Sequence, residues 1–205
     1  GYGATAASAG DVTLAPNVSG GLTKQGNGVL TLGAGNTYTG VTTVAGGTLK
    51  LGNAAALPTQ TRVVLAGGTL DLSGYTVTNT ISGAGTLANG TVETVLSPGG
   101  EGVVATDTLP LAASVTLKGT YLLDVTTTGD SDLVAVQGDV NLDNLALQVV
   151  DPNLLDRTKT YTVMTCAGTR TGKFTPVNLP DSRWRVIYGA DGSVKLFFVD
   201  RKSVV

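Results

Sequence analysis

The stretch GGTLKLGN, residues 46–53, returns as GGTLDLSG at residues 67–74, and a degraded copy, GAGTLANG, occupies residues 83–90. Each copy joins a glycine-containing turn to a threonine and to a leucine flanked by polar or small residues. Alternation with a period of two is typical of a half-buried β-strand. Recurrence at about 20 residues is typical of a solenoid, in which every repeat forms one coil and packs only against its neighbours.

This pattern predicts the role of each residue in the repeat. The glycine pairs are expected to turn the corner of a coil, and they are Gly46 and Gly47 in one copy and Gly67 and Gly68 in the next. The leucines are expected to face inward, stacked one coil above another, and they are Leu49, Leu51, Leu70 and Leu72. Thr48 and Lys50 are then expected to face water, because successive side chains of a strand point to opposite faces.

The rest of the chain supports an all-β solenoid. Short alternating segments separated by Gly, Asn and Thr turns run to the C-terminus, and no segment has convincing helical periodicity. Most of the 29 glycines precede residue 102, and most of the charged residues follow it. We therefore predict two regions that are continuous in architecture: Gly/Thr-rich β-solenoid repeats over 1–102, and a continuing solenoid with C-terminal capping strands over 103–205.

Composition excludes several classes of chemistry. The chain has no histidine, so Ser-His-Asp catalysis and every imidazole-dependent metal site are excluded. The single cysteine, Cys166, cannot form an internal disulfide or a zinc site, and a small buried apolar role is expected for it. A net charge of −2 without any basic cluster argues against nucleic acid and anionic lipid as partners. We expect no metal and no cofactor.

One segment closely resembles a known family. GGLTKQGNGVLTL at residues 20–32 continues to NTYTG at residues 36–40, then to VTTV at residues 41–44 and GGTLKLGN at residues 46–53. The segment resembles the autotransporter-associated β-strand repeat, also called the passenger-associated repeat. The second half is similar in style to the region that commonly follows the last such repeat.

The resemblance implies a right-handed parallel β-helix with a β-rich C-terminal cap region. It also implies a passenger segment of a Gram-negative-type bacterium, located outside the cell or at the outer-membrane surface. A non-enzymatic role is then expected, as a stalk, as support for secretion and folding, or as an adhesin that meets host glycans or surface proteins. Autotransporters carry a separate outer-membrane barrel, so we expect no membrane contact by this chain itself.

Two other classes of function stay open. Asp130 and Asp132, in the Asp-richest stretch, are candidates for a secreted hydrolase of aspartic-protease or glycosidase type that acts on host glycoprotein. The same residues could instead supply calcium ligands, but a structural role is favoured, with Asp130 as a turn residue and Asp132 at the start of a strand. A carbohydrate-binding module would use an exposed Trp184 or Tyr38. The favoured roles of these aromatic residues are closure of the open end of the core by Trp184 and packing by Tyr38, with Asn36 bonding neighbouring coils at a corner.

Overall fold

The computed structural model describes residues 10–11, 20–100, 106–112 and 115–200. These residues form two long sheets and contain no α-helix. In sheet order, the first sheet contains β1 (Gly10–Asp11), β3 (Val29–Leu32), β5 (Thr48–Leu51), β7 (Thr69–Asp71), β10 (Thr86–Ala88), β12 (Thr108–Leu111), β14 (Leu133–Val136), β17 (Thr160–Cys166), β21 (Ser193–Phe198) and β20 (Trp184–Tyr188).

The second sheet lies opposite the first. It contains β2 (Leu22–Lys24), β4 (Thr42–Val44), β6 (Val63–Leu65), β9 (Ile81–Gly83), β11 (Gly90–Ser97), β13 (Val115–Leu123), β15 (Val140–Asn141) and β18 (Arg170–Thr171), with β8 (Thr76–Val77), β16 (Leu145–Val149) and β19 (Thr175–Val177) paired to members of this row. A single 3₁₀ turn, η1 (Pro152–Leu154), interrupts the strands of the described part.

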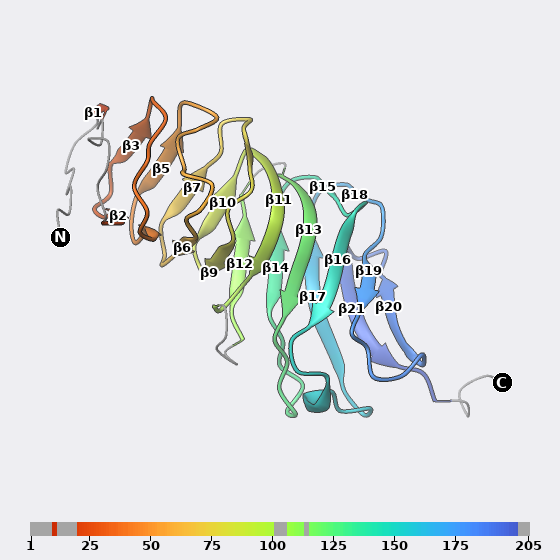
Figure 1. Ribbon diagram of the computed structural model, residues 1–205. Coiled ribbons are helices and arrows are strands. Elements are labelled where there is room, and N and C mark those ends of the chain that lie inside the picture. The colour runs from red at the N-terminus through yellow and green to blue at the C-terminus, as the bar shows by residue number, and fades with distance from the viewer. Residues whose placement is uncertain (1–9, 12–19, 101–105, 113–114, 201–205) are drawn as a thin grey trace.

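The chain winds between the two sheets as a β-solenoid, and Figure 1 shows the coils following one another from the N-terminal to the C-terminal end. Most coils place a strand in each sheet, and each strand pairs in parallel with the strand one coil later. One inward column shows the register. It runs through Leu30, Leu49, Leu70, Leu87, Leu111, Val136 and Cys166.

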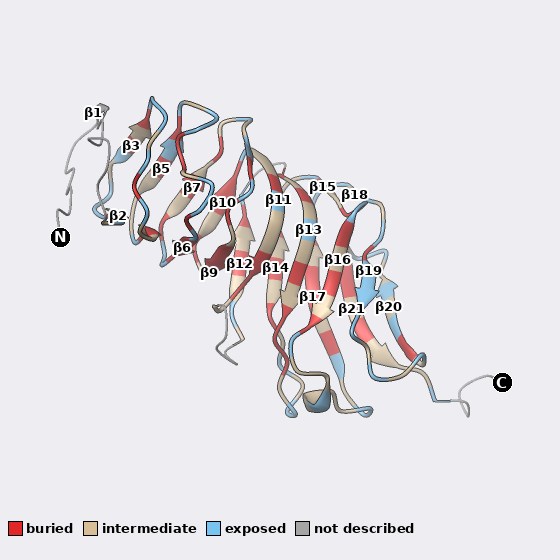
Figure 2. Ribbon diagram, in the orientation of Figure 1, coloured by how far each residue is buried: buried red, intermediate tan, exposed pale blue. Residues whose placement is uncertain are grey.

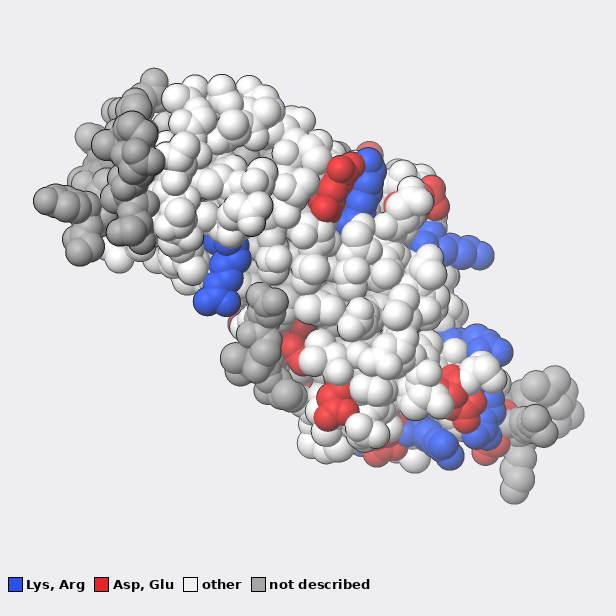
Figure 3. Space-filling model, in the orientation of Figure 1, with Lys and Arg blue, Asp and Glu red and all other residues white. Residues whose placement is uncertain are grey.

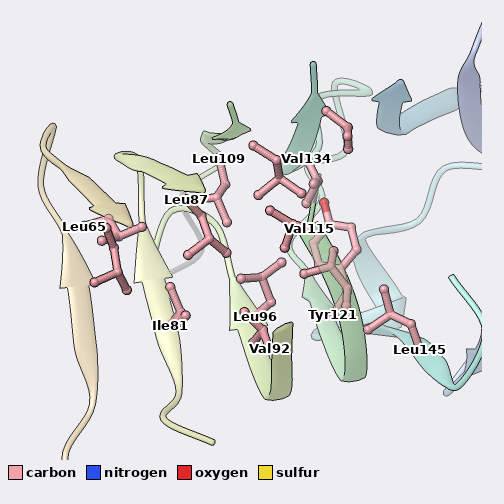
Figure 4. Packing of buried hydrophobic residues seen from close by; sticks show 14 of the residues in the cluster. Leu65, Ile81, Leu87, Val92, Leu96, Leu109, Val115, Tyr121, Val134 and Leu145 are labelled. Carbon is pink, nitrogen blue, oxygen red and sulfur yellow. The ribbon is translucent and has the colours of Figure 1, made fainter. Parts of the chain in front are cut away.

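The core is a single cluster that follows the whole solenoid. Figure 2 shows buried positions alternating with partly exposed ones along strands at both ends of the molecule, and Figure 4 shows the inward side chains of successive coils packed in sequence from Leu65 to Leu145. Leu49 and Leu70 are fully buried, whereas Lys50 is exposed. Burial of such leucines stabilises each by about 1.5–3 kcal/mol, so a coil gains its stability from the coils on either side.

The sheets cross the expected boundary near residue 102 without a break. The boundary itself, in 101–105, lies outside the described residues. On either side of it, β10 pairs with β12 and β11 pairs with β13 over seven residues, from Gly90↔Val115 to Leu96↔Tyr121. The two compositional regions therefore share one core and one pair of sheets.

The long loops change sides along the solenoid. In the first coils the long connections run from the first sheet to the second, over residues 33–41 and 52–62, while the return corners contain only three or four residues. In the later coils the arrangement reverses, and the long connections cover residues 124–132, 150–159 and 178–183. Figure 1 shows the loops of the first coils along the upper edge and those of the later coils along the lower edge.

The C-terminal end departs from the parallel pattern. β21 pairs with β17 in antiparallel orientation, and β20 pairs with β21 in the same way. On the second sheet, β19 is the last strand and carries Pro176, which has no backbone N–H to offer to a further strand. The chain thus ends the run of parallel coils with a reversal, as a capped solenoid requires.

Candidate functional sites

A buried lysine holds the first corner of the repeat. Lys24 follows Leu22 and Thr23 on β2, and the alternation of the strand turns its side chain inward, where it is only 2% exposed. Its ammonium donates to the carbonyl oxygens of Gln25, Gly26 and Gly46 at 2.8, 2.9 and 3.0 Å. All three ammonium protons are therefore used, and the last bond joins one coil to the next.

The glycine pair makes room for this ammonium. Gly47 has φ +60°, a backbone conformation that favours glycine. A Cβ at Gly47 would overlap the carbonyl oxygens of Gly26 and Gly28 and would lie 2.7 Å from the Lys24 Nζ. The sequence predicted that Gly46 and Gly47 lie at a corner. The structure adds that the Gly46 carbonyl oxygen accepts a hydrogen bond from the Lys24 ammonium. We did not anticipate the role of Lys24, although its position two residues after an inward leucine was a readable signal.

Asparagines tie the loops of the opposite edge together. The Asn36 Nδ2 donates to the carbonyl oxygens of Ala34 at 3.1 Å and of Ala56 in the next coil at 2.8 Å. Asn79, which the sequence analysis did not single out, is 2% exposed and donates to the carbonyl oxygens of Pro58 and Thr61 in the preceding coil. These side chains satisfy carbonyl groups that the irregular loops leave outside the sheets.

Tyr38 lies inside the same corner. Its ring is 2% exposed, and its hydroxyl shares a 2.6 Å hydrogen bond with the buried Thr42 Oγ1. Burial raises the pKa of the Tyr38 phenol, and the bond to Thr42 acts in the opposite direction. The ring is enclosed by protein, so it offers no open face on which a sugar could stack.

Asp130 caps an exposed hairpin tip. The chain between β13 and β14 projects as a short hairpin, closed by the antiparallel bridge between Val125 and Ser131. The Asp130 carboxylate accepts hydrogen bonds from the hydroxyls of Thr126 and Thr128, at 3.2 and 2.7 Å. These short-range bonds are those of a turn residue that stabilises its own loop.

Asp132 lies buried at the base of that hairpin. Its side chain is fully buried, its Oδ1 accepts from the backbone N–H of Asp107 at 2.9 Å, and its Oδ2 accepts from that of Asp124 at 3.2 Å. Burial raises the pKa of Asp132 to about 7, against the two backbone hydrogen bonds, with smaller upward contributions from the charges of Asp124 and Asp107. Burial also raises the pKa of the neighbouring Asp124.

Asp130 and Asp132 do not form the open pair that a hydrolase needs. Both carboxyl groups of such a pair must reach a substrate or a water molecule between them. Asp130 is held by threonine hydroxyls at the tip, whereas Asp132 is held by backbone N–H groups and exposes no surface. Neither belongs to a group of three or more metal-ligating side chains, since the described residues contain no such group.

Trp184 lies in the C-terminal cap. It begins β20, is 3% exposed, and packs edge-on against Phe198 with ring centroids 5.5 Å apart. The ring of Tyr161 on β17 is tilted against Trp184, with the two ring centroids 6.2 Å apart. Arg157 and Arg183 cover the Phe198 ring at 4.9 and 4.6 Å, and Arg183 is paired with Asp181. The tryptophan therefore faces the core, and the flanking arginines lie outside it.

Removing this ring should loosen the end of the solenoid. We expect Trp184→Ala to lower the free energy of unfolding by about 3–5 kcal/mol, the usual loss for a large buried aromatic residue. Ile187→Ala on the same strand is the matched control, because Ile187 is 47% exposed, and its effect should stay below about 1 kcal/mol. Urea denaturation followed by circular dichroism measures both, and equal midpoints for the two variants would contradict the capping role.

Cys166 completes the inward column. It is in register with Val136 and is 7% exposed, and its thiol approaches the carbonyl oxygens of Gly138 and Gly168 at 3.5 and 3.4 Å. Burial raises the pKa of the thiol, which keeps it in the unreactive protonated form at neutral pH. A small apolar residue at this point continues the stack of Leu111 and Val136.

The outer surface is unevenly charged. Figure 3 shows few charged side chains over the first coils in this view and more of both signs toward the C-terminal end. On the exposed part of the second sheet, Lys118 pairs with Glu93 one coil earlier. Nowhere in the described ranges does a helix have the length and hydrophobicity needed to cross a membrane.

These features define the class of the molecule. The molecule is an all-β solenoid whose first coils are built from a repeated corner motif and whose last coils carry an aromatic cap. Residues 22–51 match the family model of the passenger-associated-transport-repeat. The matched segment begins with the first residue of β2 and ends with the last residue of β5, so it covers two strands of each sheet. Repeats of this kind occur in autotransporter passengers, which are secreted. The whole chain matches no curated protein.

Proposed function

We propose that the chain is a non-enzymatic structural segment of a secreted or surface-attached passenger, and that it supports secretion by folding coil by coil. The observation that carries this proposal is the continuous core, which runs from the matched repeat through parallel strands in register as far as β17 and β19, where the antiparallel cap follows. The strands of each coil pair only with strands of adjacent coils, so a newly arrived coil can dock on a folded one without waiting for distant residues.

The coils differ in a way that favours growth from the C-terminal side. In the first coils the paired strands contain three or four residues, whereas β11 and β13 pair over seven residues and β13 and β16 over five. The antiparallel cap adds five further pairs between β20 and β21. Longer pairing gives the later coils more backbone hydrogen bonds, so they provide the firmer surface on which the glycine-rich coils can stack.

A secretion experiment tests the proposal. The chain is placed between a secretion signal and an outer-membrane barrel in a bacterial host, and the surface-exposed fraction is measured with added protease. Leu70→Asp breaks the stacking between two coils, and we expect it to lower the exposed fraction several-fold, because a coil that cannot fold cannot hold the emerging chain outside. Thr69→Asp, which adds the same charge one position away on the outer face, should leave the fraction nearly unchanged.

The result that would overturn this function is equal surface exposure of the parent and the Leu70→Asp variant. In that case, folding of the coils would not contribute to export. A second proposal is that the outer faces and the lower-edge loops bind host glycans or surface proteins. It predicts that the purified chain is retained on host cells, and that this retention does not depend on the buried Trp184 and Tyr38 rings.

A further inference from the structure

The first corner of the repeat contains an asparagine that is followed directly by a glycine, Asn27–Gly28. Asn27 is exposed, and Gly28 is only partly covered. Within the described ranges, neither the Asn27 side chain nor the Gly28 N–H makes a hydrogen bond. A Cβ added at Gly28 would meet nothing within 4 Å, so the space beside this peptide unit is open. The side-chain amide and the next backbone nitrogen are therefore free to approach each other.

An asparagine with a glycine after it can react with its own backbone. The Gly28 nitrogen loses its proton and attacks the Asn27 Cγ, which closes a succinimide ring; the Cγ–Nδ2 bond breaks, and the departing nitrogen takes up the proton and leaves as ammonia. Water then opens the ring, adding its hydroxyl group to one carbonyl carbon and a proton to the ring nitrogen. Glycine permits the attack because it has no side chain to hinder it.

The ring can open on either side, and the two products differ in their main chain. Opening at the former side-chain carbonyl gives aspartate. Opening at the Asn27 main-chain carbonyl gives isoaspartate, whose main chain runs through Cβ and Cγ and is longer by a single carbon atom. Both products carry a new carboxylate, but only isoaspartate lengthens the corner.

The second asparagine–glycine pair of the sequence, Asn89–Gly90, is held in place by the fold. The Asn89 Nδ2 donates to the Asp71 Oδ1 at 3.1 Å, and the Asn89 carbonyl oxygen accepts from the Gly74 N–H at 2.6 Å. Gly90 begins β11, and a Cβ there would lie 2.5 Å from the Leu72 Cβ. The same dipeptide is thus restrained at one corner and unrestrained at the other.

Asn27 lies between two points that join coils. On one side the Gly26 carbonyl oxygen accepts from the Lys24 ammonium at 2.9 Å. On the other side the Gly28 carbonyl oxygen accepts from the Thr48 N–H of the next coil at 3.1 Å. A longer main chain at Asn27 would move one of these carbonyl groups relative to the other, so the corner could not keep both hydrogen bonds unchanged.

We propose that Asn27 is a site of spontaneous modification, converted to isoaspartate by ring closure onto the Gly28 nitrogen, and that this conversion loosens the first corner of the solenoid. Water is the only reactant besides the chain itself. The fold selects Asn27 and spares Asn89, because it leaves the first side chain unbonded and fixes the second. The modification is independent of the proposed role in secretion.

Peptide mapping by mass spectrometry tests the site. The folded full chain is incubated in mildly alkaline ¹⁸O-labelled water, and fragmentation distinguishes isoaspartate from aspartate. Asn27 should convert and take up the label, whereas Asn89 should convert on the order of tenfold more slowly, because its hydrogen bond to a carboxylate must break first. In urea-unfolded chain both should convert at similar rates. The proposal fails if Asn27 stays intact, or if both convert equally fast in the folded chain.

Gly28→Ala is the matched variant for the chemistry. The added methyl group has room in the fold but hinders the attacking nitrogen, so the variant should keep the circular dichroism of the parent and convert Asn27 several-fold more slowly. An unchanged conversion rate in this variant would rule out ring closure onto the Gly28 nitrogen.

Hydrogen exchange tests the loosening of the corner. In chains that carry isoaspartate at position 27, the Thr48 amide should lose protection several-fold relative to fresh protein. Asn27→Asp has the new charge without the extra carbon atom, so its Thr48 amide should stay protected. Equal protection in converted and fresh chains, or an equal loss in Asn27→Asp, would contradict loosening by a lengthened main chain. Neither result bears on the secretion experiment, which compares variants of another coil.

Discussion

Replacing Leu49 with aspartate is expected to unfold the repeat coils, with a loss of more than about 4 kcal/mol in the free energy of unfolding. Leu49 is fully buried in the inward column, in register with Leu30 on one side and Leu70 on the other. An aspartate there would place a carboxylate among leucines with no cation or N–H donor to compensate it. The introduced carboxyl group either ionises at a high cost in free energy, or it stays protonated and its polar atoms lack hydrogen-bond partners.

Thr48→Asp is the matched control for this prediction. Thr48 lies next to Leu49 on β5 but points to the outer face, in register with Val29 and Thr69, so the same charge would stay in water. Its effect should stay below about 1 kcal/mol. Urea denaturation of the parent and of both variants gives the measurement. The inward-leucine arrangement would be wrong if Leu49→Asp had the same midpoint as Thr48→Asp.

The repeat made the coil predictable, because alternation and a fixed period are local properties of the chain. Leu49 and Leu70 share a spacing to their glycine pairs, and that spacing alone placed them on one face of successive strands. The all-β solenoid followed from it, and the structure and the family match at residues 22–51 confirm it. The switch of the long loops from one edge to the other was not predicted. The length of a loop does not indicate whether it leads from the first sheet to the second or back again.

The polar interior was harder to predict than the apolar one. In the sequence Asp132 reads as the residue that opens a strand after the turn at Gly129 and Asp130. Its burial depends on Asp107, which lies twenty-five residues earlier and supplies an N–H from another coil. The antiparallel return of β20 and β21 has the same origin, because it depends on which edge of β17 stays free after β14 has paired. Such features depend on contacts between coils, which join residues far apart in the sequence and cannot be inferred directly from one amino-acid sequence.

Replacing Lys24 with methionine is expected to detach the first coil from the second. Methionine keeps much of the apolar stem, which lies in register with Val44, but it removes the ammonium and all three of its hydrogen bonds. The carbonyl oxygens of Gln25, Gly26 and Gly46 then lose a charged donor. Because a hydrogen bond to a charged group contributes about 1.5–3 kcal/mol, and because water can reach part of this corner, a net loss of about 2–4 kcal/mol is expected.

Lys50→Met separates this effect from the mere loss of a positive charge. Lys50 has the same side chain on the outer face of β5 and is exposed, so its replacement should change stability by less than about 0.5 kcal/mol. Hydrogen exchange locates the damage: in Lys24→Met the amides of β2 and β4 should lose protection while those of β13 and β16 keep it, because a solenoid coil is coupled only to its neighbours. Unchanged protection in β2 would mean that water replaces the ammonium at this corner, and that the lysine of the repeat has a role other than holding its coils together.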